Sequence, residues 1–390
     1  MTVVDEVITH ECPACGQTVP AATFCGECGA ECNRPVTSWT RLLRPRVYAA
    51  DPREKVWAPF VSSAFFPRFP ARQRMPFRLA MILVAVAIIT LAGLRVNGPL
   101  AVTATIGWPL LGVIYLWQSD AYRDIPVRIL ATVNLLGLVF GVGWWLLAAK
   151  ILAGTYGVST GSAFALAEVL DVGWLITAGG AFLMLVPAVV IRLLPMQPRE
   201  SLDGFVIGSS GALAYWVAAA TTSIAPQFAE GLLEEQSAGR MLQDSFTTGI
   251  VNPIMTTAAG GLIGLRLWFT AGTQPGRDPK RARRALTLLT LLAAPGYLAV
   301  WAVDSLGLPR PADMAIKIGL SVLALLTMRC AVQVALLHEQ PDPASGAPHL
   351  CIHCNRVVPD LPFCSSCGGA VRASSRTSRE LLRKSAPVPI

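Results

Sequence analysis

The sequence predicts an all-α polytopic membrane bundle of eight transmembrane helices, with two small cytoplasmic zinc ribbons, one at each terminus. Three observations predict this class. Of the 390 residues, 53% are hydrophobic and only 14% are charged, well below the roughly 25% charged residues of an ordinary soluble domain. Apolar runs of about the ~20 residues that a helix needs to cross a bilayer recur along the middle of the chain. A distinctive cysteine pattern occurs near both ends.

The cysteine pattern consists of two quartets, each made of two Cys-x-x-Cys pairs. The quartets are Cys12, Cys15, Cys25 and Cys28, and Cys351, Cys354, Cys364 and Cys367. The repeat extends further, because Phe24 and Gly29 match Phe363 and Gly368. Two such pairs can bind one Zn²⁺ tetrahedrally, so we predict one structural zinc ion in each quartet. The alternative, two disulfides in each quartet, requires an oxidising compartment.

The other candidate ligands are predicted to take no part in metal binding. Cys32 lies just outside the first quartet, and Cys330 lies in an apolar run, where a small buried thiol is expected. His349 or His353 could replace a cysteine in the second quartet, but the match between the repeats argues against it. Residues 1–11 are acidic and have no apolar core, so no signal peptide is expected there.

The chain divides into six segments. These are an N-terminal ribbon over 1–33, an Arg/Pro-rich linker over 34–76, a transmembrane domain over 77–337, a second linker over 338–349, a C-terminal ribbon over 350–372 and a basic tail, predicted to be disordered, over 373–390. The first ribbon is too short for a hydrophobic core, so the metal must supply most of its folding free energy. Aromatic residues and arginines suit the first linker to the membrane–water interface; a solvated connector is the alternative.

Eight apolar runs are the predicted spans. They are Phe77–Leu94, Leu100–Trp117, Ile129–Leu152, Val169–Leu194, Leu202–Ala225, Phe246–Phe269, Ala285–Leu306 and Met314–Leu337. With the N-terminus in the cytoplasm, 27 of the 32 Lys and Arg fall on the inner side, as the positive-inside rule requires. This count includes Arg329, which is expected to extend inward from the last span. Both ribbons then lie in the reducing cytoplasm, which favours zinc thiolates over disulfides.

Glycine motifs and a proline mark the packing of the middle spans. The motifs are Gly137-x₃-Gly141, Gly204-x₃-Gly208 and Gly260-x₃-Gly264, which predict close helix contacts. Asn252-Pro253 lies near the middle of span six, where the missing proline amide predicts a kink or a short unwound turn. A polar seam between spans five and six is predicted from Thr247, Thr248, Asn252, Thr256, Thr257, Ser209 and Ser210. It forms either a ligand cavity or, as we favour, ordinary interhelical hydrogen bonds around the kink.

One part of the membrane domain resembles a known family. Residues Glu200–Gly208, which include Asp203, continue into Ala212–Tyr215 and resemble the start of a core helix in the PrsW-type membrane proteases. The segment Gly249–Leu265, with Pro253, is similar to the later His-containing helix of these proteases. The resemblance covers roughly residues 165–270. The order of ribbon, linker and bundle also resembles actinobacterial zinc-ribbon membrane proteins of unknown function.

The resemblance implies metalloprotease chemistry, but the residues for it are replaced. Gly179 and Gly180 stand where the family has paired glutamates, Ala219 stands for a further glutamate, and Asn252 stands for the histidine. An amide is a poor zinc ligand and cannot act as a general base. None of the four histidines lies inside a predicted span. The chain is therefore expected to be a pseudoenzyme, with a protease-like scaffold and no catalytic residues.

These observations lead to one functional hypothesis and two alternatives. We predict a non-enzymatic, multi-pass protein of the bacterial plasma (inner) membrane, with both termini cytoplasmic. Its zinc ribbons would dock a cytoplasmic or membrane protein, and its bundle would act as a membrane sensor or scaffold. The topology accounts for the net charge of +8, so the predicted partners are protein and the lipid bilayer rather than nucleic acid. The alternatives are a PrsW-type metalloprotease with a rearranged site, or a transporter that uses the seam.

Overall fold

The computed structural model describes residues 9–35, 37–44, 46–68, 74–119, 121–156, 165–194, 200–229, 238–273, 277–342 and 348–384. Within them, eight helical segments are long and apolar enough to cross a membrane, and they coincide with the eight predicted runs. These are α3 (Arg74–Gly93), α4 (Asn97–Gln118), α6 (Val127–Tyr156), α7 (Ala165–Leu193), α8 (Ser201–Ala229), the continuous α9 (Ala238–Phe246), η2 (Thr247–Val251) and α10 (Asn252–Trp268), then α11 (Pro279–Ser305) and α12 (Arg310–His338). Each begins before its predicted run, because a helix continues beyond the hydrocarbon core into the headgroup layer.

Three segments form the centre of the bundle. More than half of the apolar window of α8, of α9–α10 and of α12 is buried inside the molecule, whereas only 17% of that of α3 is. The outer helices expose large apolar side chains such as Leu83 in α3, Phe182 in α7 and Leu288 in α11. A soluble monomer rarely exposes so much apolar surface. The arrangement is that expected of a bundle surrounded by lipid.

The three glycine motifs pack helices against one another as predicted. A Cβ atom added to Gly208 in α8 would lie 2.1 Å from the carbonyl oxygen of Gly260 in α10. A Cβ atom added to Gly141 in α6 would lie 2.3 Å from the carbonyl oxygen of Tyr215 in α8. Any side chain at these positions would collide with backbone. Helix α8 therefore contacts its two neighbours at distances that only glycine permits.

A larger residue at this contact is expected to destabilise the bundle. Gly208→Leu should lower the free energy of unfolding by at least the roughly 1–3 kcal/mol that overpacking typically costs, since the carbonyl of Gly260 cannot move independently of its helix. Gly143→Leu is the matched control, because no atom lies within 4 Å of a Cβ added there. Thermal unfolding of the two purified variants gives the comparison. Equal losses of stability would contradict the packing described here.

The proline of the sixth span produces a local change of helix type. Helix α9 passes into the π-helical turn η2, in which the amide of Asn252 donates to the carbonyl of Thr247, five residues earlier. Pro253 has no amide to donate, so the regular ladder is interrupted at this point. The predicted departure from regular α-helix is confirmed, and it takes the form of a π turn.

The first linker is folded onto α12 and is not a solvated connector. It contains the short helices α1 (Ser38–Leu43) and α2 (Val61–Phe65). Arg329 of α12, which is fully buried, donates from Nη1 to Glu54 Oε2 at 3.0 Å and stacks 4.0 Å from the ring centroid of Tyr48. Arg329 thus extends from α12 to the first linker and is buried there. Trp57 and Phe60 remain about half exposed, so the interfacial position stays a prediction for them.

The basic tail is ordered over its described part. Helix α13 (Arg376–Lys384) follows the 3₁₀ turn η3 (Val371–Ala373), so the prediction of a disordered tail is wrong as far as residue 384. The side chain of Arg379 is buried and pairs with Asp342 Oδ2 at 3.1 Å and with Glu200. Carboxylates on distant segments, which the local sequence does not reveal, hold the helix in place.

Candidate metal centres

All four Cys-x-x-Cys pairs fold into the same turn. The amide of each first cysteine donates to the carbonyl five residues later, and the amide four residues later donates back to that cysteine. The residue after each second cysteine adopts a left-handed φ; these residues are Gly16 at 70°, Gly29 at 72°, Asn355 at 57° and Gly368 at 75°. Glycine and asparagine tolerate this conformation best. The local sequence thus places both cysteines of each pair on one side of a tight turn.

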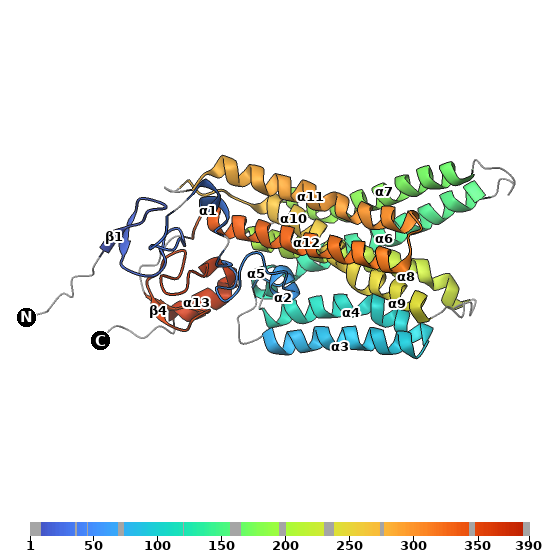
Figure 1. Ribbon diagram of the computed structural model, residues 1–390, viewed down its shortest axis with the longest axis horizontal. Helices are drawn as coiled ribbons and strands as arrows, with labels where there is room; N and C mark the ends of the chain where they lie inside the picture. Colours follow the sequence, from blue (N-terminus) through green and yellow to red (C-terminus); the bar gives the residue numbers. More distant parts are fainter. Residues whose placement is uncertain are drawn as a thin grey trace, which may run out of the picture.

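Short hairpins carry the first turn of each ribbon. Strands β1 (Thr9–Glu11) and β2 (Thr18–Pro20) pair antiparallel around the first turn of the first ribbon. Strands β3 (His349–Leu350) and β4 (Val357–Val358) do the same in the second ribbon. Figure 1 shows β1 and β4 at the same end of the bundle. An even number of spans between the ribbons requires this arrangement.

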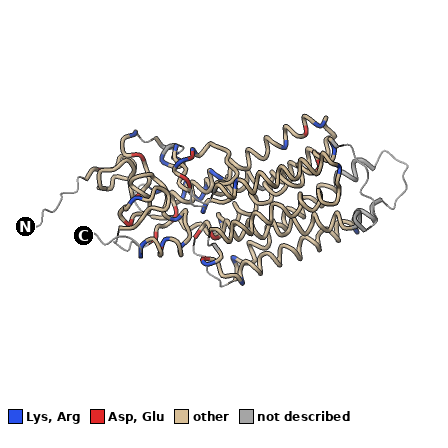
Figure 2. The backbone as a smooth tube through the Cα atoms, turned by 90° about the horizontal axis from the view of Figure 1, so that it is seen from below, with Lys and Arg blue, Asp and Glu red and all other residues tan. Residues whose placement is uncertain are grey.

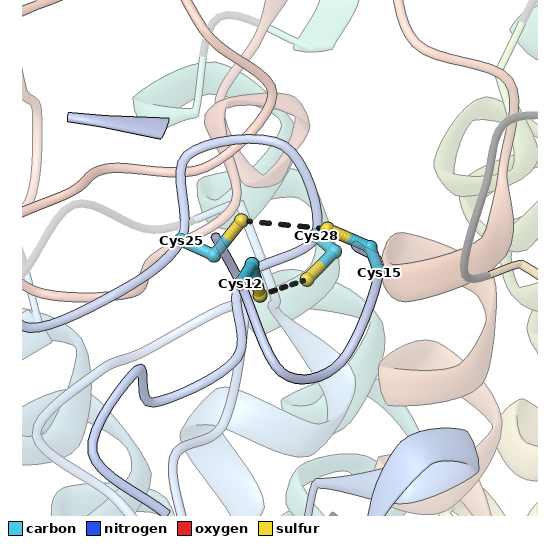
Figure 3. Close-up of side chains that lie close together, drawn as sticks. All are labelled: Cys12, Cys15, Cys25 and Cys28. Atoms are coloured by element: carbon cyan, nitrogen blue, oxygen red, sulfur yellow. Dashed lines mark hydrogen bonds between the residues drawn. The ribbon is translucent and has the colours of Figure 1, made fainter. Parts of the chain in front are cut away.

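The eight predicted cysteines meet in two quartets, and their sulfur atoms have the spacing of a tetrahedral site. In the first quartet, drawn in Figure 3, Sγ–Sγ distances are 3.8 Å between Cys12 and Cys28 and 3.8 Å between Cys15 and Cys25. The second quartet repeats both distances. Metal–sulfur bonds of about 2.3 Å in a regular tetrahedron give edges of about 3.8 Å. A disulfide needs about 2.05 Å, so the geometry favours a bound metal ion over disulfides.

The chemistry of the first quartet also requires a cation. All four of its cysteines are buried. Burial raises the pKa of Cys15 to about 12, because desolvation disfavours the thiolate. Four thiols whose sulfur atoms lie within 4.8 Å of one another can ionise together only if a positive charge lies between them. Each quartet can therefore hold one metal ion with four thiolate ligands.

The other four candidate ligands lie outside the two quartets. Cys32 Sγ is 4.0 Å from the carbonyl oxygen of Ala30, and Cys330 is buried in α12. Neither His349 nor His353 belongs to a metal-ligand group among the described residues. Among the described residues, the two metal-ligand groups therefore consist of the eight cysteines of the sequence repeat.

The two ribbons bind each other through equivalent backbone groups. The amide of Phe24 donates to the carbonyl of Ser365 at 3.1 Å, and the amide of Phe363 donates to the carbonyl of Gly26 at 2.8 Å. Phe24 is equivalent to Phe363 in the sequence repeat, and Gly26 is equivalent to Ser365. The second turns of the two ribbons are thus related by a local pseudo-twofold axis.

The repeated phenylalanines and glycines explain this pairing. A Cβ atom on Gly29 would lie 2.7 Å from the ring of Phe363, and one on Gly368 would lie 2.7 Å from the ring of Phe24. Each ring therefore packs on the glycine of the opposite ribbon. Both residue types were visible in the sequence repeat, but the repeat alone does not show that the copies meet.

No protein-family model, curated protein or solved structure matches this chain.

A buried ion cluster joins the first linker and the helix α13 to the bundle. Asp203, at the start of α8, is fully buried and pairs with Arg68 Nη2 at 2.6 Å and with Arg376 Nη2 at 2.7 Å. Glu200 pairs with Arg68 at 3.2 Å and also with Arg379. The first linker and the helix α13 are thereby fixed to the same helix start.

Four further candidate residues for the membrane seam, Asn252, Pro253, Asp203 and Gly208, lie at separate places along α8 and α10. Gly208 faces Gly260, and Asn252 lies eight residues before Gly260, roughly 12 Å away along the helix axis. Asp203 lies in the opposite direction along α8. Asn252 and Pro253 therefore belong to the π turn, Gly208 to a helix contact and Asp203 to the ion cluster.

Two seam hydroxyls on α8 make interhelical hydrogen bonds, whereas Thr256 donates to the carbonyl of Asn252 in its own helix. A cavity of about 260 Å³ is also lined by Ser209, Ser210 and Thr257, so the seam contains both of the predicted features. Ser209 Oγ of α8 donates to the carbonyl of Thr257 in α10 at 3.3 Å. Ser210 Oγ instead donates to Asn134 Oδ1 of α6 at 2.7 Å. The polar groups of α8 are thus divided between its two neighbours.

Glu339, which directly follows α12, gives the ribbon end a pH dependence. Its carboxylate accepts hydrogen bonds from the Ser201 amide at 2.7 Å and the Ser201 hydroxyl at 2.8 Å. Burial raises the pKa of Glu339 to about 7, although Arg372 and Ser201 oppose the shift. Since the folded-state pKa exceeds the ordinary 4.5, protonation stabilises the fold. This contribution is complete below about pH 4.5 and is lost as the pH rises through about 7.

The permanently neutral variant Glu339→Gln is expected to lose this dependence. The melting temperature of the variant should rise relative to that of the wild type between pH 5 and pH 8. Thermal unfolding of both proteins across this range measures the difference. A difference that stays constant with pH would show that Glu339 does not titrate there.

Proposed function

We propose that this chain is a non-enzymatic protein of a bacterial plasma membrane, whose paired ribbons each bind one structural Zn²⁺ and form a cytoplasmic docking platform for a protein partner. The observation that carries the proposal is the closed shape of both metal sites. Each consists of four thiolates at tetrahedral spacing. Such a site leaves no position for a water molecule, and catalytic zinc sites keep one open.

Ligand type and location support zinc as the metal. Four sulfur ligands in a tetrahedron suit Zn²⁺, which has no redox chemistry that the surrounding thiols could disturb. Figure 2 shows Lys and Arg gathered at the ribbon end of the bundle. This charge distribution supports a cytoplasmic position for both ribbons. A reducing cytoplasm keeps the thiols available to the metal.

The surroundings of Gly179 and Gly180, which stand where the PrsW-type proteases have paired glutamates, support a non-enzymatic function. A Cβ atom on Gly179 would lie 2.4 Å from the ring of Trp144, and one on Gly180 would lie 3.0 Å from the same ring. An aromatic side chain therefore occupies the space beside the positions where the PrsW-type proteases, which this segment resembles, carry glutamates. Asp203, which the resembling motif retains, is held by Arg68 and Arg376 and is not free to activate water.

The docking surface that we propose consists of the first turns of both ribbons, residues Gly16–Thr18 and Asn355–Val357. Both segments are exposed, and 50% of the surface of Val357 is accessible to solvent. They are equivalent in the repeat, whereas the second turns are used for ribbon pairing. The pairing thus leaves two matching surfaces free to contact a partner.

Crosslinking in cells tests the docking function. A photo-reactive amino acid placed at Gln17 or at Val357 should trap the same protein from both positions. Placed at Trp117, which is 75% exposed on the apolar bundle surface, it should trap no such protein. Failure to trap a common protein while both zinc ions are bound would reject the docking platform and leave the metal assignment intact.

A further inference from the structure

A large cavity lies beside the paired ribbons. Its volume is about 440 Å³, within the usual range of small-molecule sites. Its lining comes from both ribbons, the first linker and the end of α12, and includes Arg34, Arg44, Arg46, Phe24, Val47 and Leu337. No metal-ligating cysteine lines it. The cavity thus combines several arginines with an apolar wall, and the metal sites do not account for it.

Arg44 lacks partners that an arginine needs. Its Nε and Nη1 atoms are buried and have no hydrogen-bond partner among the described residues. A buried unpaired donor costs roughly 1–3 kcal/mol, and more when it is charged. The backbone of Arg44 is also in the left-handed region, at φ 45°, which is unfavourable for a residue with a Cβ atom. Two of the three guanidinium nitrogens of Arg44 thus find no hydrogen-bond partner in the part of the chain that the structure describes.

The loop that carries Arg44 and Arg46 is held rigidly. Gln333 of α12, which is fully buried, accepts a hydrogen bond from the amide of Ala49 at 2.7 Å. Its Nε2 donates to the carbonyls of Leu43 and Val47, each at 3.0 Å. One amide side chain therefore fixes both ends of the loop. A cavity built in this way is preorganised, so a ligand would not have to order it.

The charged residues that line the cavity are three arginines and one glutamate. Glu31 lines the cavity but pairs with Arg34 at 2.7 Å. Burial and then the positive charge of Arg44 lower the pKa of Arg277, although Glu27 and Cys28 of the first ribbon oppose the shift, so a further cation lies close by. Both Nη atoms of Arg277 donate to backbone carbonyls, those of Glu339 and Glu27. An anion would relieve this repulsion.

We propose that this cavity binds an organic phosphate. The phosphate would accept hydrogen bonds from Arg44 and lie near Arg46, since guanidinium groups match the geometry of phosphate oxygens. The apolar part of the ligand would lie against Phe24, Val47 and Leu337. This chemistry has two sources at the end of a transmembrane helix, a phospholipid headgroup and a soluble phosphate ester.

Binding by the full-length protein in neutral detergent tests the proposal. The lipid arm uses short-chain phosphatidic acid with short-chain phosphatidylcholine as its control, and the soluble arm uses phenyl phosphate with sodium chloride at the same ionic strength. Arg44→Gln removes the cation, and Val47→Trp fills the cavity while keeping every arginine. Arg128→Gln, which changes an exposed arginine that does not line the cavity, is the matched control.

We expect the wild type to bind at least one of the two phosphate probes. For that probe, Kd should rise about tenfold or more in Arg44→Gln and in Val47→Trp, and should be unchanged in Arg128→Gln. Binding in the lipid arm identifies a headgroup as the source, and binding in the soluble arm identifies a free ester. The zinc content of each variant confirms that its ribbons are folded. Absence of binding in both arms, or equal binding by wild type and both cavity variants, would overturn the proposal.

Discussion

The variant Cys12→Ser is expected to lose about one of the two zinc ions per chain and to unfold the first ribbon. Structural zinc contributes roughly 10–16 kcal/mol to the folding of such small units at neutral pH. The buried sulfur atoms of the first quartet are 3.8 Å apart in pairs, so three thiolates and a hydroxyl cannot reproduce the site. Metal analysis of the purified protein measures the loss. The matched control is Cys32→Ser, which should retain both ions, because Cys32 belongs to neither quartet.

The ribbon pairing adds a second expectation for the same variant. Phe24 and Phe363 each make a backbone hydrogen bond and a ring contact to the opposite ribbon. Unfolding of the first ribbon therefore removes the packing surface of the second. The remaining zinc ion should therefore be extracted more readily by a chelator than either ion of the wild type. Equal extraction rates would mean that the ribbons fold independently. Retention of two ions by Cys12→Ser would contradict the ligand assignment itself.

The features predicted correctly from the sequence are those with a local cause. The length and hydropathy of each apolar run are sufficient to locate a spanning helix. The spacing within each Cys-x-x-Cys pair, with a left-handed residue directly after it, forms the metal turn without help from distant residues. The proline at 253 altered its own helix as expected, because the missing amide is a property of that residue.

The features that the sequence did not reveal depend on partners far along the chain. Arg329 and Arg68 were counted as topological charges, yet both are buried, and their carboxylate partners Glu54 and Asp203 lie 275 and 135 residues away. The tail that contains α13 is basic and Ser-rich, a composition that indicates disorder when its carboxylate partners are unknown. Only a three-dimensional structure pairs these charges.

Replacing Arg68 by methionine is expected to destabilise the junction between linker, tail and bundle by about 3–5 kcal/mol, the usual cost of removing one partner from a buried ion pair. The side chain of Arg68 is completely buried. It lies 2.6 Å from Asp203, 3.2 Å from Glu200 and 3.7 Å from Asp124. Burial by itself would lower the pKa of Arg68, but these carboxylates outweigh it and raise the pKa. Without the guanidinium, the three carboxylates repel one another in a dry environment.

A double variant separates this electrostatic effect from simple loss of packing. Asp203→Asn removes one of the carboxylates that Arg68 contacts, and thereby lowers the negative charge left for Arg376 and Arg379 to balance. Arg68→Met/Asp203→Asn should therefore recover part of the stability lost in Arg68→Met. Arg128→Met, at an exposed position, should change the free energy of unfolding by no more than about 0.5 kcal/mol. Thermal unfolding measures these three variants and the single variant Asp203→Asn, and limited proteolysis of the tail reports on the junction directly. The loss of unfolding free energy in the double variant is compared with the sum of the losses in Arg68→Met and Asp203→Asn. If the double variant loses as much as this sum or more, repulsion among the carboxylates is not the cause, and Arg68 contributes through packing alone.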